Sequence, residues 1–216
     1  MRTTILQICL IFIAGTLFSQ ESEDIRLNQP DKTRGLPVMG ALSVRASANS
    51  FNPEELSLQD LSDLLWAANG INRSESGKRT APSAQNAQDI DVYVFMKHGI
   101  YLYNSKEHIL VFVVEGDHRS LIAGPQGYVA DAPLILLLVS DISRFRSGQP
   151  EQRLKSAAID AGIVSQNIAL FCASSGLATR PRASMDQQKL REVLKLNENQ
   201  HIILNNPVSY NLKRSE

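Results

Sequence analysis

The chain has 216 residues, in which 22 Lys and Arg balance 22 Asp and Glu, and 43% of the residues are hydrophobic. This composition is that of an ordinary globular protein, and it excludes a disordered chain and a disulfide-built scaffold. The zero formal net charge removes the general attraction to nucleic acid or anionic lipid, so we expect no nucleic-acid partner. The length favours a single domain.

The N-terminal segment has the layout of a secretory signal peptide. Arg2 precedes the apolar run Ile5–Phe18, and polar residues follow from Ser19 onward. The run is about 14 residues, short of the roughly 20 that a membrane-spanning helix needs, which favours a cleaved segment. Because Leu17 is bulky where cleavage prefers small residues, an uncleaved anchor stays the alternative. We expect a signal peptide at 1–20, a periplasmic location and no stable membrane anchor after cleavage.

The rest of the chain is expected to form a short lead-in and one domain. Residues 21–36 carry charges, Pro30 and Gly35 without an apolar period, which predicts a flexible lead-in to a domain at 37–216. Cys172 is the one cysteine beyond the signal peptide, so the mature chain cannot form an internal disulfide. Its apolar surroundings predict a small buried hydrophobe rather than a catalytic nucleophile.

Apolar spacing predicts three helices. The first begins after Ser57, whose side chain can cap the exposed amides, and ends at Gly70. Its apolar face is formed by Leu58, Leu61, Leu64, Leu65 and Ala68. The second, Glu151–Ser175, is long and mostly uncharged, so we expect a central helix buried on most sides. The third covers Asp186–Leu196.

The strands and one long loop complete the pattern. Alternating apolar residues predict a three-strand meander over Ile90–Val94, Tyr101–Tyr103 and Leu110–Val114. The aliphatic run Leu134–Val139 predicts a strand covered on both faces, and His201–Leu204 predicts a last strand. Residues 71–89 have no apolar period and form a loop of a length that is often functional. Helices mixed with antiparallel strands indicate an α+β domain.

The common catalytic motifs are absent from the sequence. It holds no phosphate-binding Gly-Lys-Ser/Thr loop, dinucleotide fingerprint, nucleophile elbow or His-Glu-x-x-His, and the four histidines are too scattered to suggest a metal site. Two segments are suited to a polar, planar, anionic ligand. In an extended chain Arg45 and Ser47 point to the same side and can share one anion. Residues 79–88 offer amides and hydroxyls for carbonyl and imide edges, with ordinary turn chemistry as the alternative.

The order of several motifs resembles the nitroreductase family, close to its SagB/ThcOx-type dehydrogenase branch. The resemblance extends from about Val38 to Tyr210. It is carried by Leu64-Leu65-Trp66-Ala67-Ala68-Asn69-Gly70, Pro82-Ser83-x-x-Asn86-x-Gln88, Val129-Ala130-Asp131-Ala132-Pro133, Ala161-Gly162-x-x-x-Gln166-Asn167 and Ser175-Gly176-Leu177. It implies an α+β fold with a mostly antiparallel sheet flanked by helices, assembled as an intertwined homodimer with one FMN per subunit at the interface.

The resemblance also implies roles for particular residues. Arg45 and Ser47 would contact the FMN phosphate, ribityl chain or pyrimidine edge. The residues that would reach the flavin of the partner subunit are Pro82, Ser83 and Asn86. Gln126 would face the pyrimidine ring, and Lys213 and Arg214 resemble in type the basic residues that bind the phosphate.

The sequence departs from the family pattern at two points. Asn49 stands where the family usually has Arg or Lys, which removes one cation from the flavin pocket. After Gly176-Leu177, where many members have a Pro-x-Glu-Gly-like turn, this chain has Pro181-Arg182-Ala183-Ser184, and Arg182 is a candidate to replace the lost cation.

The resemblance predicts an FMN-dependent oxidoreductase that passes two electrons through the flavin N5 to or from a small planar or unsaturated substrate. An exported member would need a donor other than NAD(P)H. A second hypothesis is an exported FMN-binding module without turnover, acting as a carrier or redox sensor. A third is a structural protein that keeps the fold without flavin.

Overall fold

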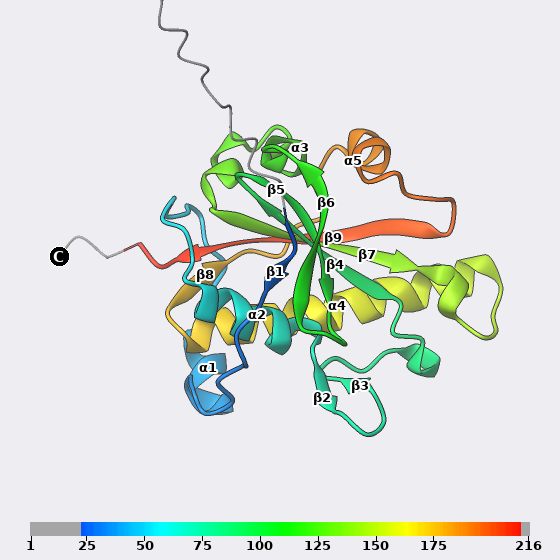
Figure 1. Cartoon of the computed structure of the whole chain (residues 1–216), viewed down its shortest axis with the longest axis horizontal. Helices are drawn as coiled ribbons and strands as arrows, with labels where there is room; N and C mark the ends of the chain where they lie inside the picture. The colour runs from blue at the N-terminus through cyan, green and yellow to red at the C-terminus, as the bar shows by residue number, and fades with distance from the viewer. Residues whose placement is uncertain (1–22, 213–216) are drawn as a thin grey trace, which may run out of the picture.

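The computed structural model describes residues 23–212. The predicted signal peptide, Lys213 and Arg214 lie outside the described residues. Within them the fold is α+β, with helices on both faces of one large antiparallel sheet (Figure 1). The strand order is β1-β6-β5-β4-β7-β9-β8, and every neighbouring pair is antiparallel. The predicted fold class is therefore confirmed.

The large sheet is built from strands β1 (Ile25–Arg26), β4 (Ile90–Met96), β5 (Gly99–Asn104), β6 (Ile109–Glu115), β7 (Leu134–Asp141), β8 (Leu177–Thr179) and β9 (Gln200–Tyr210). A separate hairpin is formed by β2 (Ile71–Arg73) and β3 (Lys78–Arg79). The α-helices are α1 (Val38–Val44), α2 (Leu58–Asn69), α3 (Arg119–Ala123), α4 (Pro150–Ser174) and α5 (Gln187–Leu194). Short 3-10 turns lie at η1 (Ala84–Asn86), η2 (Gly127–Asp131) and η3 (Ile142–Arg144).

Strand β7 lies inside the sheet, between β4 and β9, and the core is divided between its two faces. Its aliphatic residues are almost fully excluded from solvent, as the continuous apolar run predicts. Leu134, Leu136 and Leu138 point to the face covered by α2 and α4. The alternate residues point to the face covered by α3 and α5. This two-sided burial excludes water from both faces and fixes the register of the strand.

Helix α2 forms where its apolar period and its cap predict it. The Ser57 side chain accepts a hydrogen bond from the Asp60 amide, which satisfies one of the free donors of the first turn. The helix ends at Gly70, where a Cβ would lie 2.5 Å from Cδ1 of Trp66. Only glycine fits this close approach, so the sequence both starts and stops the helix locally.

Residues 23–36, expected to be a flexible lead-in, are held against the domain in the structure. Strand β1 pairs with the edge of β6. Arg34 forms ion pairs of 2.7 Å with both Asp60 and Asp63 on α2. Charged residues without periodicity therefore act here as side-chain clamps, which an apolar pattern cannot reveal.

Strand β9 is the element whose length differs most from expectation. The apolar pattern ends at Leu204, but the strand continues through Asn205, Asn206 and Pro207 to Tyr210. Both asparagines are fully buried, and each has a side-chain partner on a neighbouring segment. Tertiary hydrogen bonds thus carry the strand through residues that disfavour strands on their own.

Candidate functional site

The segment from Arg45 to Asn49 follows α1 and crosses the C-terminal end of α4. The Ala48 amide donates to the Thr179 carbonyl at 2.9 Å, which fixes this segment beside β8. Ser47 lines a pocket of about 180 Å³ together with Cys172 and other residues from α4 and β8. Arg45 and Ser47 are exposed, and neither side chain hydrogen bonds within the described part of the chain. Both are therefore available to a ligand, as the sequence suggests.

Cys172 itself is 1% exposed, and burial raises the pKa of its thiol. The predicted role as a small buried hydrophobe is confirmed.

A cation lies beside Asn49, and it comes from Arg180. The Arg180 Nη1 donates to Asn49 Oδ1 at 2.9 Å and also approaches the Ala48 carbonyl. The sequence suggested Arg182 as a replacement for the cation lost at position 49. In the structure it is Arg180 that lies beside Asn49, because β8 runs alongside the segment that contains Asn49.

Arg182 is 7% exposed, and its guanidinium is held by protein groups on three sides. It donates to the carbonyls of Ile122 and Ala123, each at 3.2 Å, and to Asn205 Oδ1 at 3.0 Å. Its Nε donates to Gln126 Oε1 at 2.9 Å. Burial lowers the pKa of Arg182, with no carboxylate among its hydrogen-bond partners. Arg182 and Gln126 therefore hydrogen bond to each other, and Arg182 links the start of η2 to β9. These bonds give the Arg182 side chain a structural role.

The loop that contains Pro82, Ser83 and Asn86 follows the β2–β3 hairpin. Pro82 and Asn86 are exposed, and Ser83 is half-buried with its Oγ accepting from the Gln88 amide at 2.8 Å. Gln85, Asn86 and Gln88 all have φ near +50°. Residues other than glycine adopt this left-handed conformation only where the surroundings fix it, and such strain is concentrated at functional sites.

The two polar segments lie at different points along α4. Ser47 shares its pocket with Cys172, whereas the amide that follows Ser83 bonds to Asp160. Twelve helical residues separate these contacts, about 18 Å at the rise of an α-helix. One chain therefore brings Arg180 to the segment that contains Arg45, Ser47 and Asn49, but it does not bring the loop at Ser83 to the same point.

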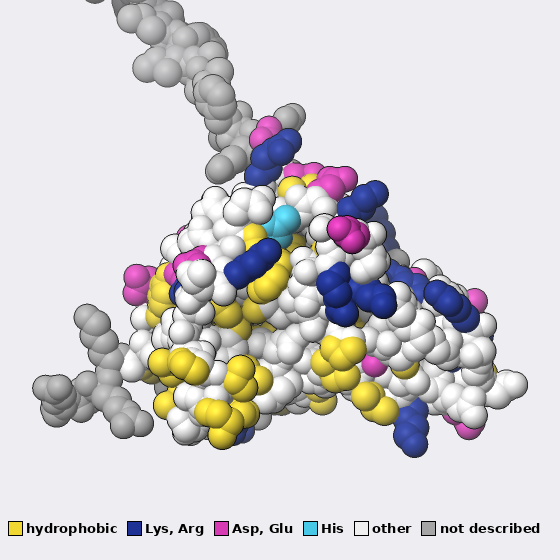
Figure 2. Space-filling view, turned by 90° about the horizontal axis from the view of Figure 1, so that it is seen from below, with side chains coloured by type: hydrophobic (Ala, Val, Ile, Leu, Met, Phe, Trp, Pro, Cys, Tyr) yellow, Lys and Arg dark blue, Asp and Glu magenta, His cyan; other side chains and the backbone are white. Residues whose placement is uncertain are grey.

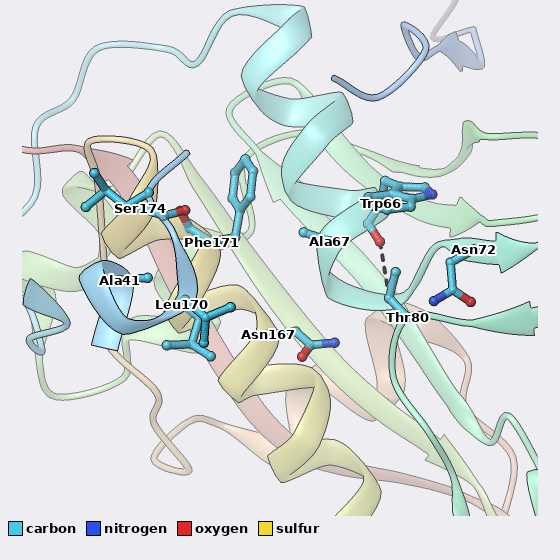
Figure 3. A pocket seen from close by; sticks show the side chains of 11 residues that line it. Ala41, Trp66, Ala67, Asn72, Thr80, Asn167, Leu170, Phe171 and Ser174 are labelled. Carbon is cyan, nitrogen blue, oxygen red and sulfur yellow. Dashed lines mark hydrogen bonds between the residues drawn. The ribbon is translucent and has the colours of Figure 1, made fainter. Parts of the chain in front are cut away.

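A third feature is a pocket of about 300 Å³ between α1, α2, α4 and the β2–β3 hairpin (Figure 3). Its walls combine the apolar side chains of Ala41, Leu170 and Phe171 with the amides of Asn72 and Asn167. The Thr80 hydroxyl donates to the Trp66 carbonyl at 3.3 Å, which joins the hairpin to α2. The pocket opens beside the outer face of α4.

Helix α4 is long and apolar enough to cross a membrane by length and composition, but it packs against the sheet, with 44% of its most apolar window buried. Its outer face remains open, contrary to the expectation of burial on most sides, and it is uncharged from Ala158 to Ser174. Ile159 on this face is 56% exposed. Figure 2 shows two groups of hydrophobic side chains on this side of the molecule, one over α1 and one over α4.

Comparison with known proteins identifies the fold and the family. The model of the nitroreductase family matches residues 42–210. The chain belongs to the nitroreductase family. A nitroreductase-family crystal structure from Ralstonia eutropha JMP134 has a TM-score of 0.80 and 37% identity, covering 89% of this chain and 91% of that one. The protein named as nitroreductase MJ1384 from Methanocaldococcus jannaschii is 28% identical over 163 residues, 71% of this chain and 82% of that protein.

More distant structures share the fold alone. A protein described as an NAD(P)H:FMN oxidoreductase from Staphylococcus epidermidis ATCC 12228 has a TM-score of 0.62 at 11% identity, covering 87% of this chain and 93% of its own. Membership of the nitroreductase family makes this chain an oxidoreductase of flavoprotein type. The family match includes the polar segments at Arg45 and Ser83 but ends before Lys213.

Proposed function

We propose that this protein is an FMN-dependent oxidoreductase that works as a homodimer, with each flavin held between two chains. The observation that carries the proposal is the pair of polar segments that contact α4 at points about 18 Å apart along the helix axis. Neither segment alone surrounds a planar ligand. A second copy, packed across the outer face of α4, would bring the loop at Ser83 of one chain toward Arg45 of the other.

The exposed donors fit the two chemical ends of FMN. Arg45 and Ser47 have side chains free of bonds within the described residues, and Arg180 adds a second guanidinium beside Asn49. Guanidinium groups and hydroxyls are suited to a phosphate. Asn86 offers an exposed amide, which has the donor and acceptor groups that an imide edge requires.

The bound flavin would supply the redox chemistry, because its N5 accepts and gives a hydride. The protein residues would bind and orient. Arg45, Ser47 and Arg180 would hold the anionic end, while Asn86 would align the ring of the flavin bound mainly by the other chain. The lack of the common catalytic motifs in the sequence is in keeping with this division of labour, since the side chains need only orient flavin and substrate. The substrate class we propose is a small planar or unsaturated molecule.

The outer face of α4 supports the second copy as the partner. It is uncharged over four turns, and depletion of charge is typical of the cores of obligate interfaces. Gly162 lies in the middle of this face, where an added Cβ would meet nothing within 4 Å in the chain. A mid-helix glycine disfavours the helix, so the close approach of another backbone explains it better than the monomer does.

We also propose that the protein is exported through the signal peptide at 1–20 and acts in the periplasm. The proposal rests on the apolar run after Arg2. NAD(P)H is not expected there, so the donor would be a different reductant. The mass of the purified protein from the periplasmic fraction tests this, because an intact Met1 in a cytoplasmic fraction would contradict it.

The visible absorbance spectrum of the purified protein tests the flavin proposal. We expect flavin bands with about one FMN per chain, identified after release by heat. A donor screen that bleaches these bands would support an oxidoreductase with turnover. Bound FMN that resists every donor would instead support the FMN-binding module, and a colourless protein that ignores added FMN would contradict both.

A further inference from the structure

The loop from Ser83 to Gln88 is held in a strained shape by partners outside itself. Three of its residues, Gln85, Asn86 and Gln88, have left-handed backbone conformations. The Gln85 side chain accepts from the amides of Arg146 and Ser147, at 3.0 and 3.1 Å. These bonds hold the outer side of the loop. The inner side depends on α4.

Asp160 on α4 is the inner anchor. Both of its carboxyl oxygens accept from the Ala84 amide, at 3.1 and 2.9 Å. The Asp160 side chain is 2% exposed, so the bond is shielded from water. Because Ala84 directly follows Ser83, this contact sets where the loop turns. Ser83 and Asp160 line the same small cavity of about 10 Å³, so little empty space is left between the loop and α4.

A second buried carboxyl group lies against this anchor. Asp89, at the end of the same loop, is 0% exposed, and its burial and the neighbouring Asp160 carboxyl group raise its pKa. Its Oδ2 accepts from the Ser140 hydroxyl of β7 at 2.5 Å. Its Oδ1 is buried without any donor among the described residues. An acceptor left in this way is satisfied if Asp89 itself carries a proton and donates it.

The surrounding cations do not neutralise the pair. Arg79 of β3 bonds to Gln88 and to the Ile90 carbonyl, and Arg144 of η3 bonds to Asp91. The other groups that face this end of the sheet are the Asp141 carboxylate, which accepts from Ser143, and His201, which pairs with Ser140 across β7 and β9. Two adjacent carboxylates without a bonded cation repel each other strongly, so one of them keeps its proton.

We propose that Asp89 and Asp160 share one proton as a carboxylic acid–carboxylate pair, and that this pair fixes the Ser83–Gln88 loop in the shape that meets the flavin. The Asp89 hydroxyl donates to Asp160, and Asp160 in turn accepts from the Ala84 amide. Both residues are positioning residues, because they act on the loop rather than on the flavin. The link to flavin rests on the proposed function, whereas the proton-sharing pair does not.

The electrostatics of the site give the pair a pH range. Burial first, and then the proximity of Asp160, raises the pKa of Asp89 from 3.8 to about 6. The folded state thus binds one proton more than the unfolded state between pH 3.8 and about 6. Stability contributed by the shared proton is complete below this range and is lost as the pH rises through it. Loss of the proton would also loosen the loop.

Denaturant unfolding of wild type and Asp89→Asn from pH 4.5 to 8 tests the pair. The asparagine amide can donate permanently to Asp160 while its carbonyl accepts from Ser140. We expect wild type to lose stability between pH 4.5 and about 6 and to lose little more above that range, with the unfolding equilibrium constant rising roughly tenfold to a hundredfold relative to Asp89→Asn. Asp141→Asn is the matched control, since it alters a neighbouring carboxylate that bonds only locally, and it should keep the wild-type step. An identical step in Asp89→Asn would overturn the proposal.

Two further measurements keep the test decisive. If Asp89→Asn does not fold, Asp160→Asn should remove the same step, because its amide can donate to Asp89 and its oxygen can accept from Ala84. The infrared carbonyl band of a protonated carboxylic acid should persist in wild type at pH 5.5 and be absent from the variant. A band equal in both proteins would overturn the pair.

FMN binding is measured separately over the same pH range. We expect the dissociation constant of wild type to rise roughly tenfold from pH 5 to 8 and that of Asp89→Asn to stay flat. If neither protein binds FMN while the stability step behaves as expected, the proposed function fails and the pair stands. If both proteins bind FMN with the same pH dependence, the pair does not fix the shape of the loop, and that part of the proposal is overturned.

Discussion

At the scale of single residues, Arg45 is the side chain whose availability to a ligand is clearest. It is exposed at the end of α1, and its guanidinium bonds to nothing in the described part of the chain. An exposed cation without such bonds contributes little to the stability of the fold. That Arg45 and Ser47 point to the same side of an extended chain stays a prediction from the sequence.

Replacing Arg45 by alanine should weaken FMN retention much more than replacing Lys97 by alanine. The reason is that Lys97 lies at the turn between β4 and β5 and lines a pocket other than the one that Ser47 lines. A charge-assisted hydrogen bond is worth about 1.5–3 kcal/mol, so Arg45→Ala should raise the FMN dissociation constant roughly tenfold or more. Flavin fluorescence during titration measures it. Equal retention by the two variants would remove Arg45 from the site.

Arg182 differs from Arg45 because its guanidinium already donates hydrogen bonds to protein groups inside the fold. Arg182→Ala would leave the Ile122 and Ala123 carbonyls and the Asn205 side chain without their donor in a buried region. We expect a loss of about 2–4 kcal/mol in the free energy of unfolding. Arg180→Ala, at a half-buried neighbour, should cost under about 1 kcal/mol but should weaken FMN binding. Urea unfolding of both variants, beside FMN titration, separates a structural from a binding arginine.

The sequence could not distinguish these two arginines. Arg180 and Arg182 are two residues apart, and either can be imagined beside Asn49. The choice depends on how β8 lies against the segment after α1, which is set by the backbone bond from Ala48 to Thr179. The role of Asp160 was hidden for the same reason. Its partner, the Ala84 amide, lies 76 positions away along the chain.

At the scale of elements, the sequence predicts those whose apolar period is strong and whose ends are marked. Helix α2 has both, β7 is a continuous aliphatic run and α4 is a long uncharged segment, and the observed bounds of all three differ from the predicted ones by a residue or two. Helix α1 was missed because it has only seven residues, no side-chain cap at Pro37, and apolar side chains that face outward. The apolar pattern predicts only the first half of β9, because Asn205, Asn206 and Pro207 in its second half disfavour a strand.

The cap of α2 offers a prediction at this scale. Ser57 accepts from the Asp60 amide and also donates to the Asp60 carboxylate, at 2.6 Å. Ser57→Ala removes both bonds and should lower the free energy of unfolding by about 1 kcal/mol. Ser76→Ala, in the exposed turn between β2 and β3, serves as the control and should be neutral. Thermal or urea unfolding compares them, and equal midpoints would show that the cap is dispensable.

At the scale of the whole molecule, the open face of α4 is the feature that a single chain explains least well. The sheet and α2 cover one side of the helix, and the other side presents an uncharged surface to solvent. Val38 and Met39 on α1 are 70% and 77% exposed beside it. Apolar residues concentrated in this way mark an interaction surface. The same face separates the two polar segments, so closing it would also complete the ligand site.

If the proposed homodimer holds the flavin across this face, replacing Ile159 by arginine should break the dimer and remove the flavin together. A charge at a 56% exposed position is tolerated in a monomer, since it stays in water, but it is costly in the middle of an apolar interface. Gel filtration with light scattering should give a dimer for wild type and a monomer for the variant, with the flavin absorbance lost from the monomer. Gln188→Arg, an exposed position on α5 across the sheet, should remain a yellow dimer. A monomeric variant that still holds one FMN per chain would show that one chain is enough to bind the flavin. A monomeric wild type would contradict the proposal of a site shared between two chains.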